Sequence, residues 1–162
     1  MRRSLALATA VALLSTISLS ASASAGNDRP ISGHFTVGVV PVEQRCGPNA
    51  LTIGFEGTGI ATHLGRMTGH GSNCTSFSLA TESVGIWDGV ATFVAADGSS
   101  LTVGYEGVQA APVAGIAGTV TTNTIVSGTG RFEDAEGSWT QSGEIDFTTG
   151  LFSGSFSGSI EY

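Results

Sequence analysis

The chain has no lysine, and all six of its positively charged residues are arginines. Two of these, Arg2 and Arg3, belong to the N-terminal segment, so the chain from Gly26 onward has four arginines against 13 acidic residues, a formal charge of −9. Nucleic acids and anionic membrane surfaces are recognised through clustered cations. The composition therefore argues against both of these partners.

Cysteine is scarce as well, with Cys46 and Cys74 as the only two. A structural metal site needs about four ligands, and no second cysteine pair completes such a set. His63 and His70 would lie on opposite faces of a continuous strand, so we expect no metal site. Thiols of exported proteins are commonly oxidised, and we predict a disulfide between Cys46 and Cys74.

Long apolar runs are confined to the N-terminal segment. Two arginines precede an apolar run at 5–19, and the small-residue sequence Ala-Ser-Ala ends at Ala25, which is typical of a secretory signal. Serines and threonines interrupt the run, which argues against a membrane anchor. We therefore expect 1–25 to be removed by either the general or the twin-arginine route. Residues 26–162 would then form one secreted domain in the extracellular, periplasmic or cell-wall space.

No window beyond the N-terminal segment has the 3.6-residue apolar periodicity of an amphipathic helix. Instead, apolar and small polar residues alternate along 35–39, 51–55 and 101–105, which is typical of half-buried strands. Further strands are expected at residues 61–69, 74–81, 84–95, 115–127, 138–147 and 151–162.

Turn sequences at Asp97-Gly98 and at 148–150 join neighbouring strands as hairpins. Eight or nine short strands in such a meander form a sandwich or a closed barrel, and closure removes the exposed edges. We therefore predict an all-β fold, a single closed antiparallel β-barrel of eight or nine strands. In the repeated segments 51–57 and 101–107, glycines would leave room for large side chains on the adjacent strand.

Residues 128–137, with the sequence GTGRFEDAEG, resemble a segment of plant dirigent proteins and, less closely, of allene oxide cyclases. Residues 138–162 and 63–66 resemble segments of bacterial allene oxide cyclase barrel-like proteins. The resemblance implies that 26–162 is an allene oxide cyclase/dirigent-like β-barrel with eight strands and a hydrophobic cavity, without metal or organic cofactor. It also implies a homo-oligomer, because the plant relatives assemble through their barrel exteriors.

The segment 128–137 also has a physical interpretation of its own. Its three glycines permit a tight, irregular excursion of the chain. Phe132 and Ala135 would then fold back as a plug against one end of the barrel, while the charged residues between them stay solvated. We therefore expect this segment to be structural.

The faces of the strands decide which polar side chains lie inside the barrel. Glu56 and Glu106 occupy equivalent positions of the repeat, opposite the apolar face, so both are expected outside. The same argument places His63, Tyr105 and Gln141 inside, in a mostly apolar pocket of the kind that binds small molecules. The predicted ligand-binding residues are His63, Tyr105, Gln141, Trp139, Phe152 and Phe156.

Three functions fit these features. The first is a secreted barrel that binds a small hydrophobic or aromatic molecule in its lumen. The second is a cofactor-free cyclase or dirigent-type stereochemical guide, in which His63 or Tyr105 handles a proton. The third is a non-catalytic extracellular interaction or structural protein. No serine or cysteine lies in a recognised nucleophile motif, which argues against hydrolysis by a triad.

Overall fold

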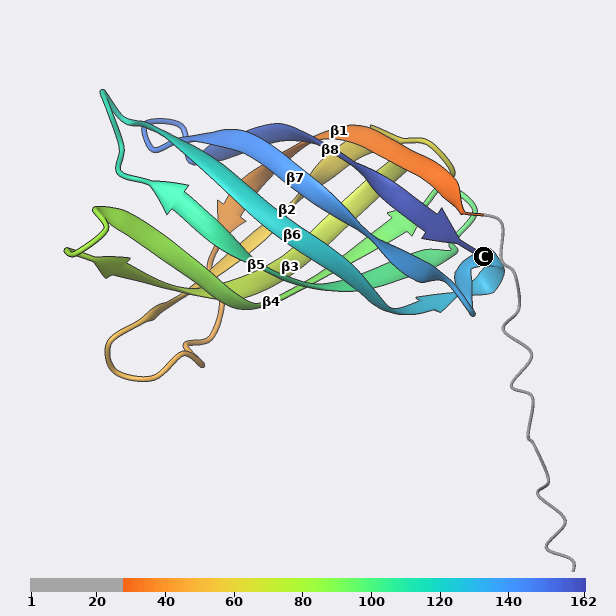
Figure 1. Ribbon diagram of the computed structural model, residues 1–162, viewed down its shortest axis with the longest axis horizontal. Coiled ribbons are helices and arrows are strands. Elements are labelled where there is room, and N and C mark those ends of the chain that lie inside the picture. The colour runs from red at the N-terminus through yellow and green to blue at the C-terminus, as the bar shows by residue number, and fades with distance from the viewer. Residues whose placement is uncertain (1–27) are drawn as a thin grey trace, which may run out of the picture.

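The computed structural model describes residues 28–162, and the predicted signal sequence at 1–25 lies outside them. Each strand pairs antiparallel with the next, and β8 pairs with β1, so the sheet closes into a barrel (Figure 1). The predicted all-β closed barrel is therefore confirmed, with eight strands. The elements are β1 (Arg29–Val40), β2 (Leu51–Ala61), β3 (Gly65–Ser78), β4 (Ser83–Ala95), β5 (Ser100–Ala110), β6 (Ile116–Thr129), the 3-10 turn η1 (Gly130–Phe132), β7 (Glu136–Asp146) and β8 (Leu151–Glu161).

The two separate strands predicted at 61–69 and 74–81 are wrong. β2 ends at Ala61, and residues 65–78 form the single strand β3. The chain reverses between them in a tight turn, where His63 has a φ of 68°. The side chain of Leu64 points into the core from this turn and is almost fully buried. The apolar alternation of the sequence therefore continues through the turn, and for this reason the sequence predicted a strand there.

The strand register assigns each side chain to the inside or the outside of the barrel. Directly opposed residues of neighbouring strands share a face. On the inside, Phe35 is opposite Gly59 on β2 and Gly154 on β8. Burial follows the same alternation, most regularly along β6, where every second residue from Ala117 to Ile125 is buried.

Glycines on the inner face make room for aromatic rings from the neighbouring strand. A Cβ atom at Gly33 would lie 2.7 Å from the ring of Phe156, and one at Gly71 would lie 2.7 Å from the ring of Phe55. In the repeated segments, Gly57 likewise lies against Val37 of β1. Large inner side chains thus occupy the space over glycines of the adjacent strand. The predicted role of the repeat glycines as space for a neighbour is confirmed at this position.

One end of the barrel is plugged by the segment 128–137. The side chain of Phe132 is fully buried, and Ala135 is buried beside it. Gly128 is indispensable for this path, because a Cβ there would lie 1.8 Å from the carbonyl oxygen of Phe132. The plug predicted from the sequence is confirmed, and it lies with the C-terminus at one end of the barrel (Figure 1).

The connection between β1 and β2, residues 41–50, lies against the outer wall near the opposite end. Cys46 forms the predicted disulfide with Cys74 of β3. Val42 packs so closely on Gly54 of β2 that a Cβ atom there would lie 2.2 Å from it. The disulfide therefore fixes this connection to the barrel wall. Among residues 28–162, no helix is long and apolar enough to cross a bilayer.

Candidate functional site

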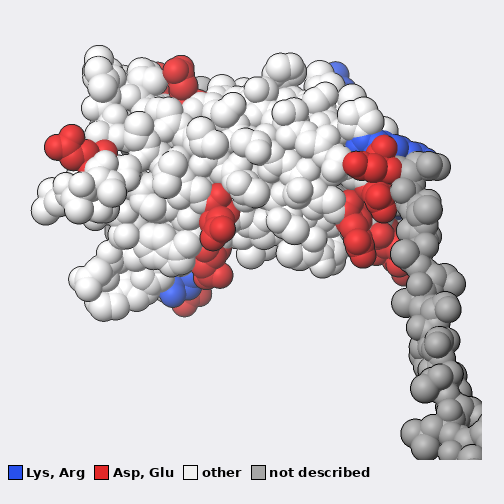
Figure 2. Space-filling view, in the orientation of Figure 1, with Lys and Arg blue, Asp and Glu red and all other residues white. Residues whose placement is uncertain are grey.

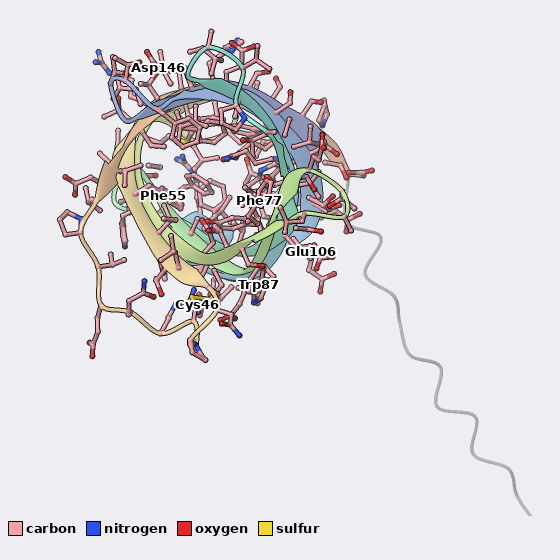
Figure 3. The ribbon with its side chains drawn as sticks, turned by 90° about the vertical axis from the view of Figure 1, so that its left-hand side faces the viewer. Cys46, Phe55, Phe77, Trp87, Glu106 and Asp146 are labelled. Atoms are coloured by element: carbon pink, nitrogen blue, oxygen red, sulfur yellow. A yellow bond between two sulfur atoms is a disulfide. The ribbon has the colours of Figure 1, made fainter. Side chains whose placement is uncertain are left out.

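The lumen is filled at the plugged end and accessible at the other. Inward-facing Leu101 and Val103 near the plug are fully buried. Toward the other end, Phe55, Gln141 and Phe152 also face inward but are only partly buried. Solvent therefore reaches the inside of the barrel from this end, which we call the open half of the lumen. Figure 3 looks into it, with Phe55 inside the wall and Cys46 outside.

The open half has one polar wall and one apolar wall. Strands β3, β5, β6 and β7 contribute amide and hydroxyl groups, whereas β1, β2, β8 and the end of β7 contribute hydrocarbon. The polar wall consists of Asn73, Tyr105, Thr119, Thr121, Asn123 and Gln141. The apolar wall consists of Val37, Ile53, Phe55, Ile145 and Phe152.

Tyr105 is the largest member of the polar wall. Its hydroxyl donates a hydrogen bond to Oδ1 of Asn73 at 2.9 Å, and its ring lies edge-on to Phe55 with 6.3 Å between ring centres. Gly89 of β4 lies beneath the ring. Burial raises the pKa of Tyr105 well above its ordinary value, against a smaller opposing effect of the Arg45 guanidinium. Tyr105 is therefore a protonated hydrogen-bond donor at neutral pH.

A second hydrogen bond orders the polar wall on β6. Nδ2 of Asn123 donates to Oγ1 of Thr121 at 3.1 Å, and both side chains are buried. Gln141 of β7 lies opposite Thr121 and is partly exposed to the lumen. The amide of Gln141 is thus a polar group of this wall that solvent still reaches.

The inward-facing strand positions of the open half carry no charged side chain. The predictions for Glu56 and Glu106 are confirmed, because both are exposed on the outer wall. Figure 2 shows acidic side chains gathered near the plugged end and in a row on the outer wall, with most of the remaining visible face uncharged. Within residues 28–162, no group of three or more histidine, cysteine or acidic side chains is placed to hold a metal ion.

The structure brings five of the six predicted site residues to the lumen. Tyr105, Gln141 and Phe152 line the open half, and Trp139 and Phe156 form its floor, with 5.4 Å between their ring centres.

The predicted inward position of His63 is wrong. His63 lies in the turn between β2 and β3, at the plugged end and not on an inner strand position, and its backbone is left-handed with a φ of 68°. Its Nε2 is 3.0 Å from the carbonyl oxygen of Pro30, and its Nδ1 is 3.2 Å from the hydroxyl of Tyr162. Through these contacts His63 links the start of β1 to the C-terminus at the plugged end.

Sequence reasoning missed Asn73, Thr121 and Asn123. Asn73 follows a glycine- and serine-rich stretch, and Thr121 and Asn123 lie in the run TVTTNT, where polar residues occupy both faces. Neither stretch has a clear apolar alternation that would assign a face. The pairing that places Asn123 inside, opposite Tyr105, is visible only in the structure.

Trp139, one of the two floor residues, has an unusual feature. Its side chain is buried, and Nε1 has no hydrogen-bond acceptor within the described structure. Buried indole N–H groups usually have a partner. This donor therefore lacks a hydrogen-bond acceptor among the described residues.

Comparisons with known proteins give structural neighbours alone. No family model matches the chain, and no curated protein matches it. Two solved structures are similar to it, both of pterocarpan synthase dirigent proteins. PsPTS1 is 17% identical with a TM-score of 0.47, covering 84% of this chain and 96% of that one. GePTS1 is 17% identical with a TM-score of 0.45, covering 85% of this chain and 93% of that one. The chain is thus similar in structure to dirigent proteins, the family that residues 128–137 resemble.

Proposed function

We propose that the protein binds a small hydrophobic or aromatic molecule in the open half of its lumen. The observation that carries this proposal is the set of inward-facing side chains that remain accessible to solvent, with a polar wall opposite an apolar one. Small-molecule sites are mostly apolar and concave, with a few polar groups that orient the ligand. The open half of the lumen offers an apolar wall for the body of a ligand and an opposite polar wall that can orient it.

Binding without proton transfer fits the site better than acid–base catalysis. A general acid or base works best with a pKa near the operating pH. Burial raises the pKa of Tyr105 away from neutrality, and His63 lies in the turn at the plugged end. The alternative of a stereochemical guide that acts by confinement requires the same binding step, so binding is the property to test first.

We further propose that the protein works outside the cytoplasm. The disulfide between Cys46 and Cys74 supports this location, since disulfides persist in oxidising compartments and are rare in the cytosol. Isolation of the protein from the medium or the cell envelope of its own host, with the N-terminus starting near Gly26, would support export. Recovery of the full-length chain in the cytoplasm would overturn it.

The proposed binding can be tested with a variant that fills the lumen. Gln141→Phe places a ring at a partly exposed inner position, and Ser142→Phe places the same ring on the outer face one residue away. Binding of 2-acetylnaphthalene, measured by isothermal titration calorimetry, should weaken at least tenfold in Gln141→Phe and remain unchanged in Ser142→Phe. Equal affinity in both variants would contradict binding in the lumen.

A different observation supports a second function, self-association. The rim of the open end carries a ring of exposed apolar side chains, and large exposed apolar patches commonly mark interaction sites. The rim residues are Val39, Leu51, Phe77, Leu79, Val113 and Phe147. Sedimentation velocity should then show an oligomer that dissociates in the double variant Leu79→Ser/Val113→Ser. A wild-type monomer at 100 μM or so would exclude this function.

A further inference from the structure

The indole N–H of Trp139 is a buried donor without an acceptor. The side chain is only 3% exposed, and Nε1 makes no hydrogen bond within the described structure. A buried polar group without a partner is costly, and such groups in native proteins commonly meet a water or a ligand. The position of Trp139 in the barrel indicates from which side a hydrogen-bond acceptor can reach the indole N–H.

Hydrocarbon surrounds Trp139 on the side of the plug. Its ring centre lies 6.0 Å from that of Phe93 and 5.4 Å from that of Phe156. Beyond them, toward the plug, the core contains Ile125 and Ile160, both buried. None of these side chains has an oxygen or nitrogen acceptor. The side of the plug thus offers no acceptor among these residues, which leaves the open half as the side from which an acceptor can reach the indole N–H.

The polar side chains nearest in register are already oriented. Asn123 lies opposite Trp139 on β6, and its amide nitrogen is used in the bond to Thr121. Gln141 follows Trp139 two residues along the inner face of β7 and lies opposite Thr121 and Phe156. Trp139 at the floor of the open half thus has a donor without an acceptor, and two amide side chains are its neighbours in the register.

We propose that the ligand is an uncharged molecule with a flat apolar body and a hydrogen-bond acceptor, and that the indole N–H of Trp139 binds this acceptor at the floor of the lumen. This inference rests on the proposed function and names the ligand class of the same site. The apolar body lies against Phe55 and Phe152 of the apolar wall. A carbonyl, ether or hydroxyl oxygen at its inner end pairs with Nε1.

The requirement for an uncharged ligand follows from the side chains of the lumen. The inward-facing positions of the open half have no cation or anion to pair with a charged group. A charge taken from water into such a site would be left without a partner, which is strongly unfavourable. A ligand without an acceptor fits the lumen but leaves the indole N–H unpaired, which costs about tenfold in affinity.

Three naphthalenes of nearly equal size separate these requirements. The first, 2-acetylnaphthalene, has a carbonyl acceptor, 2-ethylnaphthalene has none, and 2-naphthoate is charged. Titration calorimetry of the full barrel should give about tenfold tighter binding of the ketone than of the hydrocarbon, and no binding of the carboxylate at neutral pH. In Trp139→Phe, which keeps an aromatic ring, the ketone should lose this advantage.

Nuclear magnetic resonance observes the donor directly in the unaltered protein. The chain has two tryptophans, and Trp87 lies partly exposed on the outer wall. In a ¹⁵N-labelled sample, the Nε1–H proton of Trp139 should move to higher frequency with the ketone and move less with the hydrocarbon, while that of Trp87 stays unchanged. This measurement does not depend on whether Trp139→Phe folds.

The outcomes separate the inference from the proposed function. Equal affinities for the ketone and the hydrocarbon, with no ketone-specific shift of the Trp139 signal, would overturn the inference and leave ligand binding in the lumen intact. Tighter binding of 2-naphthoate would overturn the uncharged ligand class. Absence of binding by all three compounds, together with an unchanged Trp139 signal, would overturn both proposals.

Discussion

The hydroxyl of Tyr105 on β5 donates a hydrogen bond to Oδ1 of Asn73 on β3, across the inner face of β4. The ring can lie there because β4 has Gly89 beneath it, where a Cβ atom would be 2.6 Å from the ring. Nδ2 of Asn73 in turn donates to the carbonyl oxygen of Cys74 at 3.3 Å. One side chain thus connects three strands and fixes part of the polar wall of the lumen.

Removing the hydroxyl should destabilise the barrel. Tyr105→Phe leaves Oδ1 of buried Asn73 without this donor, which costs about 1–2 kcal/mol of unfolding free energy. Tyr162→Phe is the matched control, since its hydroxyl is exposed and only contacts His63. Urea unfolding of both variants measures the difference. An equal, small loss in the two would show that the Tyr105 bond contributes nothing specific.

Tyr105 also predicts how stability depends on alkaline pH. Burial raises its pKa in the folded state above that of an unfolded tyrosine, which is about 10. The unfolded chain therefore loses this proton first, and the stability contribution, fully present below pH ~10, is lost as pH rises toward the folded pKa. Urea midpoints between pH 8 and 11 should fall more steeply for the wild type than for Tyr105→Phe. Parallel curves would contradict the raised pKa.

The sequence predicted the parts of the fold that rest on local patterns. The alternation at 101–105 put Tyr105 inside, and that at 51–55 put Glu56 outside, because side chains alternate between the faces of a strand. The glycines of 128–137 predicted the plug, since only a residue without Cβ fits beside the carbonyl of Phe132.

The errors arose where local pattern and tertiary position differ. Leu64 is buried although it lies in a turn. Its apolar side chain continued the strand-like pattern, so the turn that contains His63 was interpreted as part of a strand. Asn73 lies inside because of the register between β2 and β3, where it is opposite Ile53. Register depends on contacts between strands, and a single sequence does not display it in a stretch with polar residues on both faces.

The space beneath the Tyr105 ring predicts a strong effect of a single methyl group. In Gly89→Ala the new Cβ would meet both the ring and the carbonyl oxygen of Tyr105 at 2.6 Å, so the ring or β4 must shift. We expect a loss of about 1–3 kcal/mol in unfolding free energy. Gly118→Ala is the control, because nothing lies within 4 Å of a Cβ there. Chemical unfolding of the two variants should differ by at least 1 kcal/mol or so, and similar stabilities would refute the packing described.

The disulfide should contribute substantially to the stability of the barrel. It links Cys46 to Cys74 across 28 residues of sequence, and closing such a loop contributes about 3–4 kcal/mol in the chain-entropy model. The double variant Cys46→Ala/Cys74→Ala should unfold at correspondingly lower denaturant with an unchanged β-sheet circular dichroism spectrum. The oxidised wild type treated with a thiol alkylating reagent serves as the control. A loss below 1 kcal/mol or so would show that the unfolded chain gains little freedom without the bond.

His63 provides a test of where the binding site ends. Its ring contacts Pro30 and Tyr162 at the plugged end, so His63→Ala should cost about 0.5–1.5 kcal/mol of unfolding free energy through the lost hydrogen bonds. The affinity for 2-acetylnaphthalene should stay within about twofold of the wild-type value, since calorimetric differences of that size correspond to less than 0.5 kcal/mol or so. Gln141→Phe, on the inner face, should show the opposite pattern, with weakened binding and little change in folding. A large loss of affinity in His63→Ala would place the ligand at the plugged end and not in the open half.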